Sequence, residues 1–139
     1  ALKKAEANQK LDDTDRAMVT EALASVEALA KAEADKAGTA MGEGRYFDAL
    51  ETWEQLKKHF GGHPVADEAK AKIKELKGDK TKRDEIEAGR RIAKALAAAE
   101  AGKDKKAVQT LKTVTTGRLS TTEEATRARK LLEEMSAGN

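Results

Sequence analysis

Residues 44–64 read GRYFDALETWEQLKKHFGGHP, and this stretch decides the fold. Its apolar side chains recur every three or four residues, at Tyr46, Ala49, Leu50, Trp53, Leu56 and Phe60. That spacing places them on one face of an α-helix, because a helix turns once about every 3.6 residues. Glycines bracket the pattern, and Pro64 suits the first turn of a following helix. The stretch therefore predicts a helix over about residues 45–60 that is entered and left through tight turns.

Similar start and stop signals divide the rest of the chain into helices with short connections. Asp12-Asp13-Thr14 marks the start of a long helix, and Thr81 and Thr121-Thr122 are expected to cap two later ones. Residues 1–11 are also helix-prone. The expected helices span roughly residues 14–42, 45–60, 64–78, 81–102, 104–115 and 121–135. The sequence thus predicts an all-α fold of about six helices that pair as antiparallel hairpins.

Composition supports this class and excludes others. The 139 residues include 27 Ala, 27 basic and 25 acidic side chains, with no Cys and a net charge of +2. The near-continuous Val and Ile runs of a parallel sheet are missing, and so is an apolar run of about 18 residues that would span a membrane. Without Cys, disulfide and thiolate chemistry are excluded. We expect a single domain, 1–139, and a mature form or excised fragment, since the chain starts at Ala1 without Met or a signal peptide.

An internal repeat relates the two halves of the chain. When the sequence is aligned with itself at an offset of 58 residues, small apolar, large apolar and glycine residues coincide. An offset of 59 residues continues the match to the end of the chain. The superposed pairs are Ala37 and Ala95, Ala40 and Ala98, Gly44 and Gly102, Ala49 and Ala107, Trp53 and Leu111, Leu56 and Val114, Ala66 and Ala125, Ala69 and Ala128, Ile73 and Leu132, and Leu76 and Met135. We expect two stacked units, roughly residues 24–80 and 82–139, because neither would bury its Ala-rich faces alone. Trp53 should then lie at a helix junction, and Gly44 and Gly102 should end helices with positive φ.

The motif Gly44-Arg45-Tyr46-Phe47-Asp48-Ala49-Leu50, followed by Trp53, Leu56 and Pro64, resembles the second helix of a tetratricopeptide repeat. The resemblance implies a short right-handed α-solenoid of helix hairpins. The preceding helix departs from the family pattern, because charged residues replace large apolar ones at Glu33 and Lys36, and again at Arg91 and Lys94. An extra third helix per unit also breaks the usual period of about 34 residues.

The layout of most of the chain is also similar to the helical C-terminal tails of some bacterial envelope thioredoxin-like proteins. It runs from a long Ala-rich helix through the quoted stretch to EIEAGRRIAKALAAAEAGK, residues 85–103. This second resemblance implies an accessory domain of a redox protein, located in the periplasm or cell envelope. The chain itself has no Cys-x-x-Cys.

No cluster of residues predicts catalysis, a metal or a cofactor, so we expect a protein that is not an enzyme. His59 and His63 have the spacing of a helical metal pair, but Gly61-Gly62 separates them and no third ligand is evident. Lysines crowd the third helix and its exit, but acidic residues interleave with them and no aromatic residue lies among them. A solvated, ion-paired face is therefore favoured over nucleic-acid binding there.

The sequence favours a non-catalytic protein–protein interaction or scaffold module that binds a protein or peptide partner. Two alternatives stay open: an accessory helical domain of a thioredoxin-like protein, whose partner is an upstream domain of the same polypeptide, or a weak polyanion or nucleic-acid binder. In tetratricopeptide-like stacks the first helix of each repeat lines the concave face. The resemblance thus implies a groove that presents Glu33, Lys36, Arg90, Arg91 and Lys94, where the cations hold an acidic peptide or carboxy-terminus.

Overall fold

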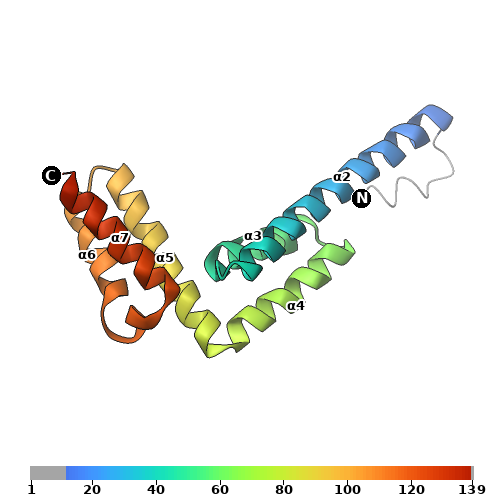
Figure 1. The fold of residues 1–139 in the computed structure, drawn as a ribbon. Helices are drawn as coiled ribbons and strands as arrows, with labels where there is room; N and C mark the ends of the chain where they lie inside the picture. Colours follow the sequence, from blue (N-terminus) through green and yellow to red (C-terminus); the bar gives the residue numbers. More distant parts are fainter. Residues whose placement is uncertain (1–11, 139) are drawn as a thin grey trace.

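The computed structural model describes residues 12–138, which form six α-helices, one 3-10 helix and no strand (Figure 1). The elements are α2 (Asp13–Gly42), α3 (Tyr46–His59), α4 (Pro64–Gly78), α5 (Lys80–Glu100), α6 (Asp104–Thr115), η1 (Gly117–Thr121) and α7 (Glu123–Ala137). The prediction of an all-α fold with about six helices is confirmed. The helix-prone segment 1–11 lies outside the described residues.

Short polar side chains begin three of the helices, α2, α5 and α7, by accepting backbone hydrogen bonds. The Asp12 carboxylate accepts from the N–H of Asp15 at 2.7 Å, as the sequence predicts for the start of α2. The expected cap at Thr81 is wrong, because Asp79 caps α5 and Thr81 lies inside the helix. Asp outcompetes Thr here because its carboxylate is the stronger acceptor at a helix N-terminus. For α7 the cap is Thr122, whose hydroxyl accepts from the N–H of Ala125 at 3.1 Å.

Gly44 and Gly102 end α2 and α5 in the same way. Their φ angles are 74° and 75°, which confirms the predicted left-handed conformation. In each turn the residue after the glycine donates its N–H to the carbonyl five residues earlier at 2.8 Å: Arg45 to Ala40, and Lys103 to Ala98. This Schellman pattern satisfies carbonyls that the helix end would otherwise leave unpaired.

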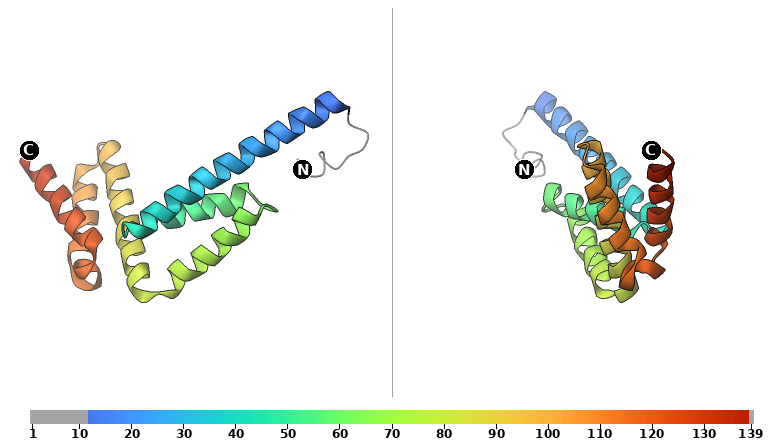
Figure 2. Two further views of the ribbon diagram at one scale, coloured as in Figure 1. Left: turned by 45° about the vertical axis from the view of Figure 1, so that its right-hand side comes forward. Right: turned by 90° about the vertical axis from the view of Figure 1, so that its left-hand side faces the viewer.

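Two apolar clusters form the core, and α5 contributes to both. The first cluster joins α2, α3 and α4 around Trp53 and includes Ile86 from the start of α5. The second joins the rest of α5 to α6 and α7 around Ile92 and Leu111. Figures 1 and 2 show the resulting shape, in which α5 stands where the α2–α4 half meets the α6–α7 half.

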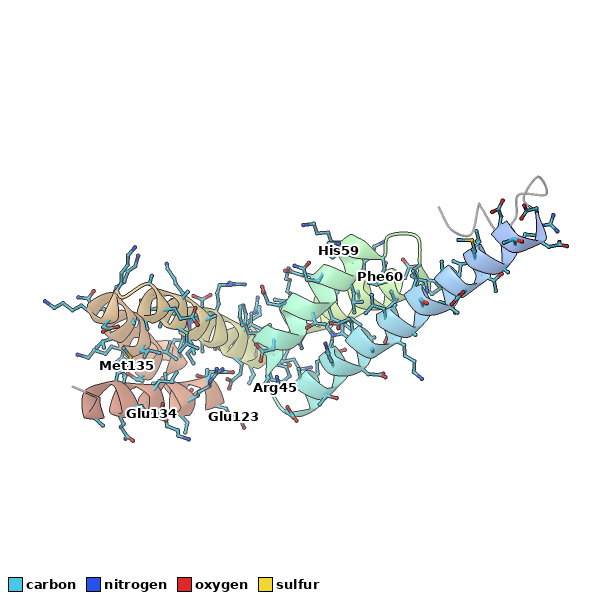
Figure 3. All side chains as sticks on the ribbon, turned by 90° about the horizontal axis from the view of Figure 1, so that it is seen from above. Arg45, His59, Phe60, Glu123, Glu134 and Met135 are labelled. Atoms are coloured by element: carbon cyan, nitrogen blue, oxygen red, sulfur yellow. The ribbon has the colours of Figure 1, made fainter. Side chains whose placement is uncertain are left out.

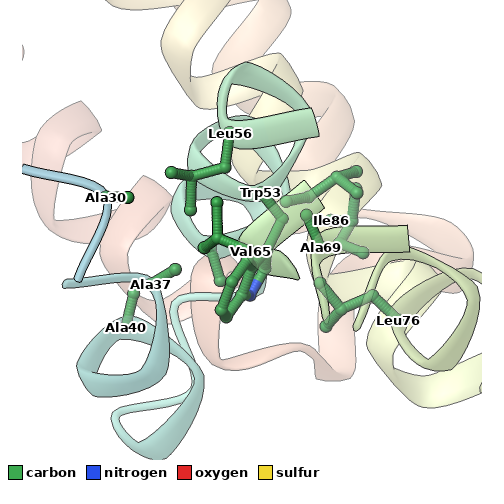
Figure 4. Close-up of a cluster of buried hydrophobic side chains, with 11 residues drawn as sticks. Ala30, Ala37, Ala40, Trp53, Leu56, Val65, Ala69, Leu76 and Ile86 are labelled. Atoms are coloured by element: carbon green, nitrogen blue, oxygen red, sulfur yellow. The ribbon is translucent and has the colours of Figure 1, made fainter. Parts of the chain in front are cut away.

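Most apolar pairs of the sequence repeat have similar burial, although Leu76 is fully buried and its counterpart Met135 is only partly buried. Trp53 is 2% exposed and Leu111 is 1% exposed, and the alanine pairs Ala37 and Ala95, and Ala49 and Ala107, are all fully buried. The Trp53 side chain lies between the alanines of α2 and the apolar side chains of α4 (Figure 4), so its predicted place at a helix junction is confirmed. Small residues at these sites let the helix axes approach closely.

The long helix α2 projects beyond the rest of its half of the molecule (Figure 2, left). It has 30 residues, whereas α3, which packs against it, has 14. None of the helices within residues 12–138 is both long enough and apolar enough to cross a membrane.

Candidate binding groove

An open groove of about 920 Å³ lies between α2 and α4. Both helices pack on α3 but contact each other at few places, and the groove lies between them. Trp53 from α3 contributes to the floor. The lining comprises Glu27, Ala30, Lys31, Ala34, Asp35, Gly38, Thr39 and Met41 of α2, Trp53 of α3, and His63, Pro64, Val65, Glu68 and Lys72 at the start of α4.

Small side chains on α2 make the groove. Ala30, Ala34 and Gly38 follow one another at intervals of four residues along its wall. At Gly38 a Cβ atom would meet nothing within 4 Å, so the backbone itself borders open space. The repeat offset of 58 superposes Ala34 on Ile92, which is 1% exposed in the second core. At this position the second half therefore has a large buried side chain, whereas α2 has an alanine that lines the groove.

The floor and the rim of the groove carry polar groups. The Nε1–H of Trp53 is buried and has no acceptor among the described residues. At the rim, His63 caps α4, since its Nδ1 accepts from the N–H of Val65 at 3.1 Å, which leaves the ring proton on Nε2. Acidic and basic side chains alternate along the two edges, with Glu27, Lys31 and Asp35 on α2, and Glu68 and Lys72 on α4. The groove combines an apolar interior with a charged rim.

The residues predicted to bind form two separate local sets. Glu33 and Lys36 pair with each other on α2, with 2.7 Å between Lys36 Nζ and Glu33 Oε1. On α5, Arg90 and Arg91 both pair with Glu87, at 3.2 and 2.9 Å, and Lys94 is exposed. Helices α2 and α5 do not contact each other within residues 12–138, because α3 lies between them. The structure therefore does not bring the two sets together.

Glu33 also borders a second hollow, on the side of α2 that faces the end of α3. This pocket of about 350 Å³ is mainly apolar, with Leu29 on one wall and Phe60 on the other. His59 lies there and contacts Gln55 at 2.9 Å, whereas His63 is engaged in the α4 cap. The two histidines thus have separate local partners.

The crowded lysines of α4 and its exit form ion pairs with nearby acids. Lys77 pairs with Glu54 at 3.0 Å, and Lys82 pairs with Glu75 at 3.0 Å. The hydrogen bond from Lys82, together with the charge of Lys72, lowers the pKa of the Glu75 carboxyl below its usual value. This face therefore carries neutralised pairs, as the sequence favoured.

The sequence did not predict the contact that Glu85 makes between α5 and α7. It is 7% exposed, and its two carboxylate oxygens accept from the N–H groups of Glu123 and Glu124 at 2.7 and 3.1 Å. A residue of α5 thereby supplies the acceptors at the N-terminus of α7. The partners are 38 and 39 residues apart in sequence, so no local signal could have indicated the contact. Figure 3 shows Arg45 and Glu123 at this junction.

Burial at the same junction affects a second carboxyl group. Glu124 is 9% exposed, and this burial raises the pKa of its carboxyl, while the nearby charges of Glu85 and Asp48 raise it further. Arg127 acts in the opposite direction, with its Nη1 at 3.5 Å from Glu124 Oε2.

Comparison of the chain with protein-family models, with curated proteins and with solved structures gave no match. The function is therefore inferred from the groove and the residues around it.

Proposed function

We propose that the chain is a non-catalytic interaction module that holds a helical segment of a protein partner in the groove between α2 and α4. The open groove is the observation that carries this proposal. Along α2 it runs from Glu27 to Met41, and at about 1.5 Å per residue this corresponds to about 20 Å of helix. That length matches an amphipathic helix of three to four turns, a segment that commonly lies with its apolar face in such grooves.

The lining supports a helix as the occupant. Alanine and glycine on α2 allow another helix axis to approach closely, as they already do where α2 packs on α3. A bound helix that carries a large apolar residue opposite Ala34 would fill part of the groove, just as a large residue, Ile92, is buried at the aligned position of the second half. Its burial would add contacts over Trp53 and Val65.

The helix hairpins of the chain also support a tetratricopeptide-like organisation, which we propose as the architecture of this scaffold. The matching Schellman turns at Gly44 and Gly102, and the buried alanines that follow them, are the features that favour it. Under the resemblance to envelope redox proteins, a neighbouring domain of the same polypeptide would be one source of the bound helix.

A groove-filling substitution tests the proposal. Gly38→Leu places a side chain in open space and removes a helix-interior glycine, so the protein should remain folded while the groove is obstructed. The probe is a set of peptides of about 20 residues selected from a displayed random library against the full chain. Ala28→Leu, on an exposed face of the same helix outside the groove, is the matched control.

We expect Gly38→Leu to weaken binding of the selected peptides at least tenfold and Ala28→Leu to leave it unchanged. Trp53 is the single tryptophan, so its fluorescence should change when a peptide enters the groove and should not respond in the Gly38→Leu protein. A selection without binders, or binders that are indifferent to Gly38→Leu, would refute the proposal.

A further inference from the structure

The N-terminal turns of α2 extend past the end of α3. Leu29 lies opposite His59 and Phe60, where α3 ends, so residues 13–26 project from the molecule over about 20 Å of helix. Figures 1 and 2 show this projection clearly. Within residues 12–138, α2 contacts α3 and α4 only. The projecting turns therefore have a face that no described element covers.

An apolar stripe runs along that face into the groove. Its members are Val19, Leu23, Val26, Ala30 and Ala34, spaced by three or four residues. Ala30 is buried against α3 and lines the groove together with Ala34, whereas Val19, Leu23 and Val26 are half-buried on the projecting turns. One straight helix can contact Val19, Leu23, Val26 and Ala34, because these four residues lie within about 80° on the helix circumference, whereas Ala30 is already covered by α3.

The net charge of the projecting turns indicates what that helix carries. Residues 12–29 contain five carboxylates and one basic side chain, Arg16. Two such segments would repel each other, which disfavours a second copy of this chain as the occupant. The same charge disfavours a nucleic acid. A helix with Lys and Arg beside its apolar face would instead be attracted to the projecting turns, whereas the groove rim carries both signs of charge.

We infer that the stripe and groove form one docking surface for a basic amphipathic helix. This inference rests on the proposed function and extends it by naming the charge of the partner and by adding the projecting turns to the binding surface. The apolar face of the bound helix packs on Val19, Leu23 and Ala34, and its cations lie near Glu27 and the acidic start of α2.

The peptides selected against the full chain test this inference in three ways. Sequencing should show Lys and Arg outnumbering Asp and Glu at least threefold among binders. Affinity, measured by fluorescence anisotropy of a labelled selected peptide, should fall at least tenfold in Leu23→Glu. The affinity should change less than twofold in Met18→Glu. This control also replaces an apolar residue by Glu on the projecting turns, but Met18 is 64% exposed and lies away from the stripe.

A second pair of variants isolates the charge. Glu27→Lys lies beside the stripe and Glu21→Lys lies on the opposite face, and both residues are exposed. We expect Glu27→Lys to weaken binding of the basic peptide at least threefold more than Glu21→Lys at low salt, with the difference shrinking at high salt.

Failure of the inference is distinguishable from failure of the proposed function. Binders that depend on Gly38 but show no basic excess, or that ignore Leu23→Glu and Glu27→Lys, would leave the groove in place and overturn the basic partner. A chain that dimerises in sedimentation equilibrium, and becomes monomeric in Leu23→Glu, would show a second copy on the stripe and also overturn it. A selection that yields no peptide overturns both.

Discussion

Replacing Glu85 tests whether the contact between α5 and α7 stabilises the whole molecule. In Glu85→Ala the N–H groups of Glu123 and Glu124 lose acceptors at 2.7 and 3.1 Å. A hydrogen bond to a charged group contributes about 1.5–3 kcal/mol, and water can reach the more exposed of these donors, so we expect a loss of about 2–4 kcal/mol. Glu85→Gln keeps one good acceptor and should lose about half as much.

The measurement is urea unfolding followed by far-ultraviolet circular dichroism, with the slope compared between variants. Glu87→Ala is the matched control, because it removes a glutamate from the same helix whose partners, Arg90 and Arg91, lie at the surface. Surface pairs of this kind contribute little, so the control should lose less than about 1 kcal/mol. If Glu85→Ala and Glu87→Ala differ by less than about 0.5 kcal/mol, which is near the error of such measurements, the account of the junction is incorrect.

Three further predictions concern packing and ionisation. Gly89→Ala should destabilise the protein by about 1–3 kcal/mol in thermal unfolding, because the new Cβ would lie 2.6 Å from Phe47 Cβ. Gly38→Ala should instead stabilise it by about 0.5–1 kcal/mol. Equal effects would contradict the close packing of α3 on α5 at Gly89. Glu124→Gln should be more stable than the parent at pH 7, and the difference in stability should shrink as the pH falls towards 4.5, because burial raises the folded-state pKa of Glu124 above its ordinary 4.5. Urea midpoints at the two pH values check this, and a difference that grows on acidification would contradict it. Trp53→Ala should cost about 3–5 kcal/mol in urea unfolding, and a cost below about 1 kcal/mol would place the indole outside the core.

The helices could be predicted from the sequence because their signals are local. Asp12 and the apolar spacing after it define α2, and glycines at 44 and 102 end α2 and α5, all of which depends on residues within one or two turns. The error at Thr81 was also local. Asp79 lies two residues earlier and accepts the N–H of Lys82, so the helix begins there and Thr81 falls inside it.

The groove could not be predicted because it depends on how helices diverge. Ala34 and Gly38 look like ordinary helix residues in the sequence, and only the angle between α2 and α4 leaves them facing open space. The predicted binding residues were placed by analogy with a concave face shared by two first helices. In the structure α3 lies between α2 and α5. These two helices therefore do not line a common face through direct contact. Glu85 required a contact across 38 residues, which no periodicity encodes.

The neighbouring positions of Glu85 and Ile86 have a consequence for force and motion. Ile86 packs into the first core while Glu85 holds the start of α7, so two successive residues attach α5 to opposite halves. A tilt of the first turn of α5 must therefore displace both attachments together. A shift of α4 against α5 would therefore act on the Ile86 and Glu85 contacts together.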